Sequence, residues 1–129
     1  MYEENVAIAR RLVEAINQDA VPRDLLTPDC EIKNATTAVT EATYHGYEGA
    51  LKWRSEFFDV VEDARFEIEE ILATGPDFVA IANRIVGTGS SSGVPVVLRW
   101  ASVIWVRDGK IARAVGFNSR RAALEAAAG

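Results

Sequence analysis

The chain has 129 residues, which is enough for one domain and too short for several, so we expect a single domain over residues 1–129. Hydrophobic residues make up 49% and charged residues 26% of the chain, which is typical of a globular protein and excludes a disordered or collagen-like chain. The net charge of -5 disfavours binding to nucleic acid or to an anionic membrane surface. Acidic residues near the N-terminus do not fit a secretory signal, so we expect a cytoplasmic protein.

Three helices are predicted in the first half of the chain. Apolar side chains recur at the spacing of an amphipathic helix over residues 3–18. Pro22 suits the first position of a short second helix, which Pro28 ends. Apolar positions at the same spacing predict a third, heavily buried helix over residues 47–61. The segment between the second and third helices contains a brief strand and a stretch without a period.

The second half of the chain is predicted to form four antiparallel strands and a last helix. The strands are expected over residues 66–72, 78–86, 94–106 and 110–117. The pair Asp108-Gly109 favours the positive backbone angles of a tight type I′ turn between the last two strands. Asn118 or Ser119 is expected to cap the alanine-rich terminal helix. The fold class is therefore α+β, with three N-terminal helices packed on one face of a curved antiparallel sheet and a cleft between them.

This order of elements is accompanied by three local sequences: PDCEI at the end of the second helix, YHGYEGA at the start of the third, and VIWVRDGKIARAVGF in the last hairpin. Together they resemble the SnoaL-like branch of the nuclear transport factor 2-like superfamily, over almost the whole chain. The resemblance implies a cone-shaped α+β barrel with an apolar pocket at its wide end, which often forms a dimer through the sheet. It also implies functions that range from isomerase, epoxide hydrolase and polyketide cyclase to binding alone, so the fold does not settle the function.

The catalytic positions of two related enzyme families fall on uncharged residues here. The carboxylate base of ketosteroid isomerases falls on Asn34, their tyrosine on Leu12 and their second acid on Ser102. An amide cannot accept the proton, which argues against that mechanism. The asparagine of limonene-epoxide-hydrolase-like enzymes also falls on Asn34, but their three charged residues do not match. Those three fall near Asn83, Ile85 and Gly116.

Few residues offer other chemistry. A metal site needs several clustered ligands, and one histidine with one cysteine does not supply them, so we expect no metal and no cofactor. Cys30 is interpreted as a small buried hydrophobe rather than a nucleophile. His45 is the one candidate catalytic residue, because its ordinary pKa suits proton transfer near neutrality, with capping or packing of the third helix as the alternative.

Strand alternation separates the two faces of the sheet. Trp100 and Ser102 share one face of their strand, and the family resemblance implies that this face lines the pocket. Arg99 and Trp105 share the other face, which is left for solvent or a dimer interface. The predicted ligand-binding residues are Leu12, Ile32, Asn34, Trp53, Asn83, Trp100, Ser102 and Asn118.

The sequence thus predicts an apolar, uncharged pocket that binds a small hydrophobic molecule, such as a polyketide, terpenoid or steroid-like compound. As an enzyme the protein resembles SnoaL-like cyclases, isomerases or hydrolases. The alternative is a non-catalytic binding or assembly module, a homodimer whose functional surface is the sheet face that carries Arg99 and Trp105.

Overall fold

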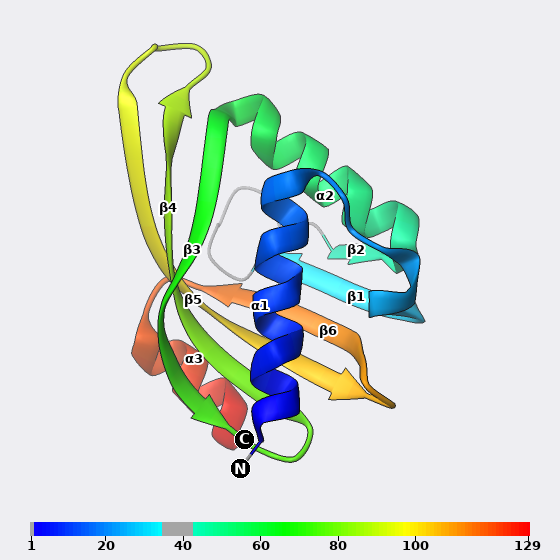
Figure 1. The fold of residues 1–129 in the computed structure, drawn as a ribbon. Coiled ribbons are helices and arrows are strands. Elements are labelled where there is room, and N and C mark those ends of the chain that lie inside the picture. Colours follow the sequence, from blue (N-terminus) through cyan, green and yellow to red (C-terminus); the bar gives the residue numbers. More distant parts are fainter. Residues whose placement is uncertain (1, 35–42) are drawn as a thin grey trace.

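The computed structural model describes residues 2–34 and 43–129, which form three α-helices, a short 3-10 helix and six strands (Figure 1). In chain order the elements are α1 (Glu3–Gln18), η1 (Arg23–Leu25), β1 (Leu26–Asn34), β2 (Thr43–His45), α2 (Gly46–Val60), β3 (Val61–Thr74), β4 (Phe78–Gly89), β5 (Pro95–Arg107), β6 (Lys110–Phe117) and α3 (Arg120–Ala128). The predicted α+β class, with a helix near each end of the chain, agrees with this order.

The six strands form one curved sheet in the order β2-β1-β6-β5-β4-β3 (Figure 1). The predicted antiparallel meander is confirmed for β3 to β6. The expectation of a wholly antiparallel sheet is wrong, because β1 pairs with β6 in parallel and the sheet is therefore mixed. Parallel neighbours need a long connection between them, and the chain from β2 to β5 provides it.

The helices are spread along the chain, so the prediction of three N-terminal helices is wrong. The expected second helix is reduced to the three residues of η1, and the backbone is extended again at Leu26. Pro28 explains this difference, because a proline disfavours the helical conformation of the residue before it, here Thr27. The chain therefore enters β1, and the register of β1 with β6 is irregular between Leu26 and Glu31, where the proline lies.

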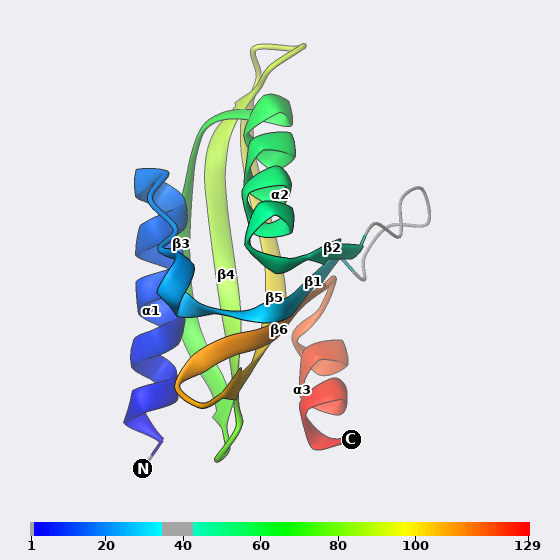
Figure 2. The ribbon, with the colours of Figure 1, turned by 90° about the vertical axis from the view of Figure 1, so that its right-hand side faces the viewer.

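The helices also cover both faces of the sheet rather than one. Helices α1 and α2 pack against one face, and α3 packs against β3, β4, β5 and β6 on the other (Figure 2). Neighbouring residues of β4 show the two faces: Val79 and Ile81 belong to the core beneath α1 and α2, whereas Ala80 belongs to a smaller core beneath α3. The larger core surrounds the site described below.

Two local predictions about backbone geometry are confirmed. Asp108 and Gly109 have φ angles of 55° and 76°, as a tight hairpin turn between β5 and β6 requires. Of the two residues proposed to cap α3, the cap is Ser119, whose Oγ accepts a hydrogen bond from the Ala122 N–H at 3.1 Å.

Helix α1 has the predicted amphipathic pattern, but its apolar face is only partly covered. Ala9 and Ile16 are buried, whereas Leu12 and Val13 are half-buried. Leu12 and Val13, which lie between Ala9 and Ile16, therefore face a space that the sheet does not fill.

Candidate ligand-binding cavity

A cavity lies between α1, α2 and the concave face of the sheet. The centre of a water-sized sphere can move through ≈ 80 Å³ of this cavity. All the space between the lining atoms, including the part open to solvent, amounts to ≈ 760 Å³. The larger figure includes open solvent, so the smaller one describes the enclosed space. The lining is mostly apolar and aromatic. It includes Leu12, Val21, Ile32, Trp53, Phe66 and Trp100.

Alternate residues of neighbouring strands supply the floor of the cavity. Successive side chains of a strand point to opposite faces, so Trp100 and Ser102 of β5 face the same side. The register places Gly116 of β6 beside Ser102, and Asn34 of β1 beside Gly116. A row of small and polar residues therefore crosses the floor of the cavity from β1 to β5.

Asn34 is held at one end of this row by a residue of α2. The indole Nε1 of Trp53 donates a hydrogen bond to Oδ1 of Asn34 at 3.2 Å. Because an indole N–H can only donate, the atom of the amide that faces it is the oxygen. The amide nitrogen of Asn34 is then the end that remains for another partner.

Asn83 and Ser102 form a second polar pair on the same floor. Nδ2 of Asn83 donates to Oγ of Ser102 at 2.9 Å, diagonally across β4 and β5. Asn83 is only 4% exposed, so its amide is removed from bulk water. A buried amide is costly unless it is hydrogen-bonded, and this bond offsets part of that cost.

Aromatic rings form the wall between α2 and the sheet. Trp53 stacks with Phe57 at 6.0 Å between ring centroids, and Phe57 meets Trp100 edge to face at 5.8 Å. Phe66 contacts Trp53 edge to face at 6.0 Å. These offset and edge contacts are favourable arrangements of aromatic rings and hold the wall rigid.

The expectation of an uncharged pocket is wrong in one respect, because Lys33 and Arg54 also border the cavity. The Arg54 side chain is 14% exposed, and its Nε donates to the carbonyl oxygen of Ile16 at 2.8 Å. Its Nη1 lies 3.2 Å from a carboxylate oxygen of Asp19. The guanidinium therefore binds the C-terminal end of α1 and does not face the interior of the cavity. No carboxylate borders the cavity among residues 2–34 and 43–129.

Helical spacing could have identified Arg54. It follows Ala50 by four residues and precedes Phe58 by four, and its guanidinium lies 3.8 Å from the centroid of the Phe58 ring. The prediction from the sequence included only apolar members of this face and so left out the cation.

The structure brings together seven of the eight predicted ligand-binding residues around the cavity. Asn118 borders another hollow, together with Glu69, Arg99 and Arg120, and this hollow shares Asn83 and Trp100 with the cavity. The reason is that β6 ends at Phe117, so the alternation of its side chains does not extend to Asn118.

His45 does not border the cavity. It lies exposed at the junction of β2 and α2, opposite Glu31 of β1, and its side chain makes no cap hydrogen bond to the helix. The catalytic role considered for His45 thus has no support from its position.

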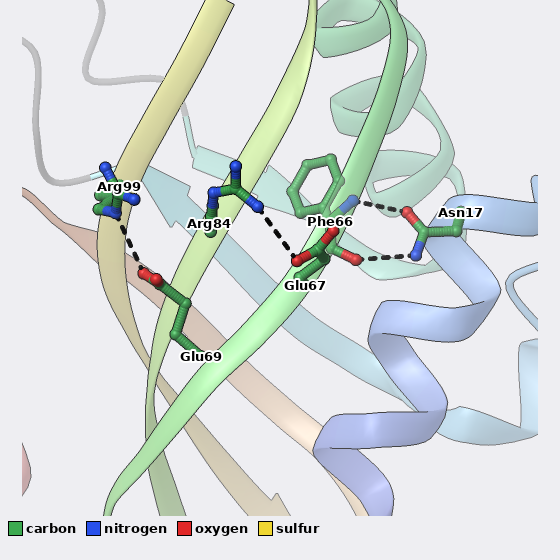
Figure 3. A network of polar contacts seen from close by, with 6 residues as sticks. All are labelled: Asn17, Phe66, Glu67, Glu69, Arg84 and Arg99. Atoms are coloured by element: carbon green, nitrogen blue, oxygen red, sulfur yellow. Dashed lines mark hydrogen bonds and ion pairs between the residues drawn. The ribbon is translucent and has the colours of Figure 1, made fainter.

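Asn17 of α1 positions one wall of the cavity, which the sequence analysis missed. Its Nδ2 donates to the carbonyl oxygen of Phe66 at 2.9 Å, and its Oδ1 accepts from the Phe66 N–H at 2.8 Å (Figure 3). Both bonds are made to the backbone of β3, which is the edge strand of the sheet. The two bonds fasten α1 to β3 at the residue whose ring lines the cavity.

Charged residues occupy the opposite face of the sheet as ion pairs. Glu67 and Arg84 lie 3.5 Å apart, and Glu69 and Arg99 lie 3.4 Å apart (Figure 3). Trp105 is half-buried against the core beneath α3, with the guanidinium of Arg113 4.8 Å from its ring centroid. The residues considered for a dimer interface therefore have partners within the chain.

Cys30 is fully buried, as predicted, and burial raises the pKa of its thiol above the ordinary value. The described residues contain no group of three or more histidine, cysteine or acidic side chains placed to hold a metal ion. Among the described helices, none is long and apolar enough to span a membrane.

The model of the SnoaL-like domain family matches residues 9–114, which is most of the chain. The chain belongs to the SnoaL-like family. No curated protein sequence matches this SnoaL-like protein. Its fold is nevertheless shared by solved structures that cover nearly its whole length.

Three of these structures are similar at low sequence identity. IdmH, a candidate polyketide cyclase from Streptomyces antibioticus, has a TM-score of 0.75 and 23% identity, with 97% of this chain and 99% of IdmH covered. A candidate SnoaL-like polyketide cyclase from Jannaschia sp. CCS1 has a TM-score of 0.75 and 18% identity, with 96% and 91% covered. A protein with a ketosteroid isomerase-like fold from Catenulispora acidiphila, in complex with trimethylamine, has a TM-score of 0.74 and 19% identity, with 92% and 89% covered. At these identities the likeness shows the fold alone.

Proposed function

We propose that this SnoaL-like protein binds a small, hydrophobic and weakly polar molecule in the cavity between its helices and its sheet. The observation that carries the proposal is the composition of the cavity. Its lining is apolar and aromatic, and the groups on its floor that are free to bond a ligand are amides and a hydroxyl. Sites of this kind bind a ligand by burying its apolar surface and orient it through a few polar contacts.

The chemistry of the lining favours a rigid, mostly carbon skeleton, such as a polyketide, terpenoid or steroid-like compound. A cationic ligand would lose its hydration without gaining a counter-ion, because the described lining contains no carboxylate. The guanidinium of Arg54 is already bonded to Ile16 and Asp19. The two fold neighbours described as candidate polyketide cyclases agree with a ligand of this class.

The described lining supports binding and orientation rather than proton transfer. A cyclase, isomerase or hydrolase that moves a proton needs a group to accept it, and the lining residues in 2–34 and 43–129 include neither a carboxylate nor an imidazole. Asn34 occupies the position at which the sequence comparison placed the isomerase base. We therefore propose ligand binding as the function that the cavity performs.

Filling the cavity tests this proposal. Ala114 borders the cavity, and Ala114→Leu adds three carbon atoms there. Wild-type protein with a ligand at ten times its dissociation constant gains about 1.4 kcal/mol, which raises its melting temperature by about 5 °C. We expect this rise for at least one compound of a panel of bicyclic hydrocarbons, cyclic ketones and sterols, and expect Ala114→Leu to abolish it.

Ala112→Leu is the matched control, because Ala112 lies in the same strand and does not border the cavity. We expect this variant to retain the response to ligand. A melting temperature that rises with protein concentration but with no compound of the panel would contradict ligand binding and favour the dimeric assembly module.

A further inference from the structure

We infer that the open space over Gly116 is a subsite for a carbonyl oxygen of the ligand, which receives hydrogen bonds from Asn34 and Ser102. The inference rests on the proposed function and adds the chemical group by which the cavity selects among apolar molecules. Three independent features of the cavity floor support it: an unfilled position, a fixed amide and an oriented hydroxyl.

The unfilled position is at Gly116. In the register of the sheet Gly116 lies between Asn34 of β1 and Ser102 of β5. A Cβ atom built on Gly116 meets no atom of the other described residues within 4 Å, its two neighbours in the chain aside. Neighbouring strands are about 4.8 Å apart, so the strands that carry the two polar side chains are about 10 Å apart. That distance leaves room over the glycine for one atom that both side chains can reach.

Nothing in the backbone demands a glycine at this position. Gly116 is not among the glycines with a positive φ angle, unlike Gly109 in the adjoining turn. Its lack of a side chain therefore matters for the space it leaves rather than for the conformation it permits.

The amide of Asn34 has a donor available for this space. Its oxygen already accepts from the indole of Trp53, so the end that remains is Nδ2. Among the residues that the structure describes, Nδ2 has no acceptor. An incoming ligand atom that meets it favourably must be an acceptor.

The hydroxyl of Ser102 also has a donor available. Its oxygen accepts from Nδ2 of Asn83, which leaves its own hydrogen to donate. Two residues with a donor available thus flank Gly116 in the register of the sheet. A carbonyl oxygen has two lone pairs and no hydrogen, and it satisfies both donors at once, whereas an aliphatic carbon satisfies neither.

The test uses 1-tetralone and tetralin, which share a bicyclic skeleton and differ by one carbonyl oxygen. The dissociation constant of each compound is measured by isothermal titration calorimetry, and the quantity compared between variants is the ratio of ketone affinity to hydrocarbon affinity. A change in cavity size that affects the affinity for both compounds equally cancels in this ratio.

Gly116→Ala places a methyl group in the subsite. Because the position is open and the φ angle is ordinary, we expect the variant to fold and to melt at the wild-type temperature or above it. One hydrogen bond changes affinity about three- to tenfold, so loss of both should lower the ratio about tenfold or more.

Asn34→Asp keeps an oxygen acceptor for the Trp53 indole and replaces the Nδ2 donor with a second oxygen. At pH 8 the carboxylate repels a carbonyl oxygen, and we expect the ratio to fall about tenfold or more. Gln18→Glu is the matched control, since it makes the same amide-to-carboxylate change on the exposed end of α1. Its ratio should stay within twofold of the wild-type value.

A ratio within twofold of wild type in either Gly116→Ala or Asn34→Asp would overturn the subsite and leave the proposed binding function standing. Failure of both compounds to bind the wild-type protein would contradict the binding function itself, and the subsite with it.

Discussion

Individual side chains give the cavity its polarity through pairing with one another. The indole of Trp53 donates a hydrogen bond to the oxygen of Asn34, and the amide of Asn83 donates one to the oxygen of Ser102. Asn34 and Ser102 each keep a donor for a ligand. An apolar residue in place of Asn83, which is 4% exposed, would pack in the core without the cost of burying an amide. We infer that the polar row is kept for binding rather than for stability.

Cys30 provides a prediction about pH at the same scale. Burial raises the pKa of its thiol above the ordinary value of 9.0, so the folded protein holds this proton more tightly than the unfolded chain. The corresponding stability is complete below the unfolded pKa and is lost as pH rises toward the folded pKa. We expect the free energy of unfolding in urea to fall between pH 8.5 and pH 10 (about the range in which a free thiol titrates) more steeply in wild type than in Cys30→Ala.

Cys30→Ala retains the other titrating groups, including Tyr44, whose pKa is raised by its hydrogen bond to Glu56. The difference between the two pH profiles therefore isolates the thiol. Parallel profiles for the two proteins would show that the thiol is not protected in the fold.

Most of the candidate site could be predicted from single residues. Asn83 and Ser102 stand out because they interrupt apolar strands. Strand alternation separated the two faces, and the family resemblance indicated which face lines the pocket. Asn118 could not be placed in this way, because the alternation depends on where β6 ends. The orientation of the Asn34 amide depends on Trp53, which is 19 residues away in the chain, and no local pattern carries that information.

Among the elements, α1 is fixed to the sheet by more than its apolar face. Asn17 makes both of its hydrogen bonds to the backbone of Phe66 in β3, and Asn5 donates to the carbonyl oxygen of Gly75 beyond the other end of that strand at 2.8 Å. These bonds satisfy backbone groups at the edge of the sheet and position the helix that closes one side of the cavity.

Asn17→Ala should therefore destabilise the protein. It leaves the N–H and the carbonyl group of Phe66 without these partners in a partly buried place, which costs about 2 kcal/mol. The measurement is the free energy of unfolding in urea, with the exposed neighbour Gln18→Ala as the control, for which a change below about 0.5 kcal/mol is expected. A loss below that size for Asn17→Ala would show that the two bonds do not anchor the helix.

The elements themselves differ in how far the sequence predicts them. Strong local signals were sufficient for the amphipathic α1, for α2 and for the hairpin turn at Asp108-Gly109. The parallel pairing of β1 with β6 joins segments about 80 residues apart, so local periodicity cannot predict it. The second helix was predicted too long, because Pro28 was treated as its end, whereas the proline also disfavours the helical conformation at Thr27 and only η1 forms.

The whole molecule is organised around a sheet with different surroundings on its two faces. One face carries a small alanine-rich core under α3 and a set of ion pairs, and such exposed pairs contribute little to stability. The other face carries the main core and an unfilled cavity, and a cavity of this kind lowers stability relative to a filled core. We interpret this cost as the consequence of the proposed binding function, which would use the inside of the molecule rather than the outer face of its sheet.

The three tryptophans allow this central claim to be tested in one measurement, because Trp53 and Trp100 border the cavity and Trp105 lies on the opposite face. The measurement is a ¹H–¹⁵N spectrum of the indole N–H groups during titration with 1-tetralone, each signal assigned by single substitution. The account predicts that the Trp53 and Trp100 signals move and saturate together while the Trp105 signal stays in place. Movement of the Trp105 signal alone, or of none of the three, would contradict a ligand site in the cavity.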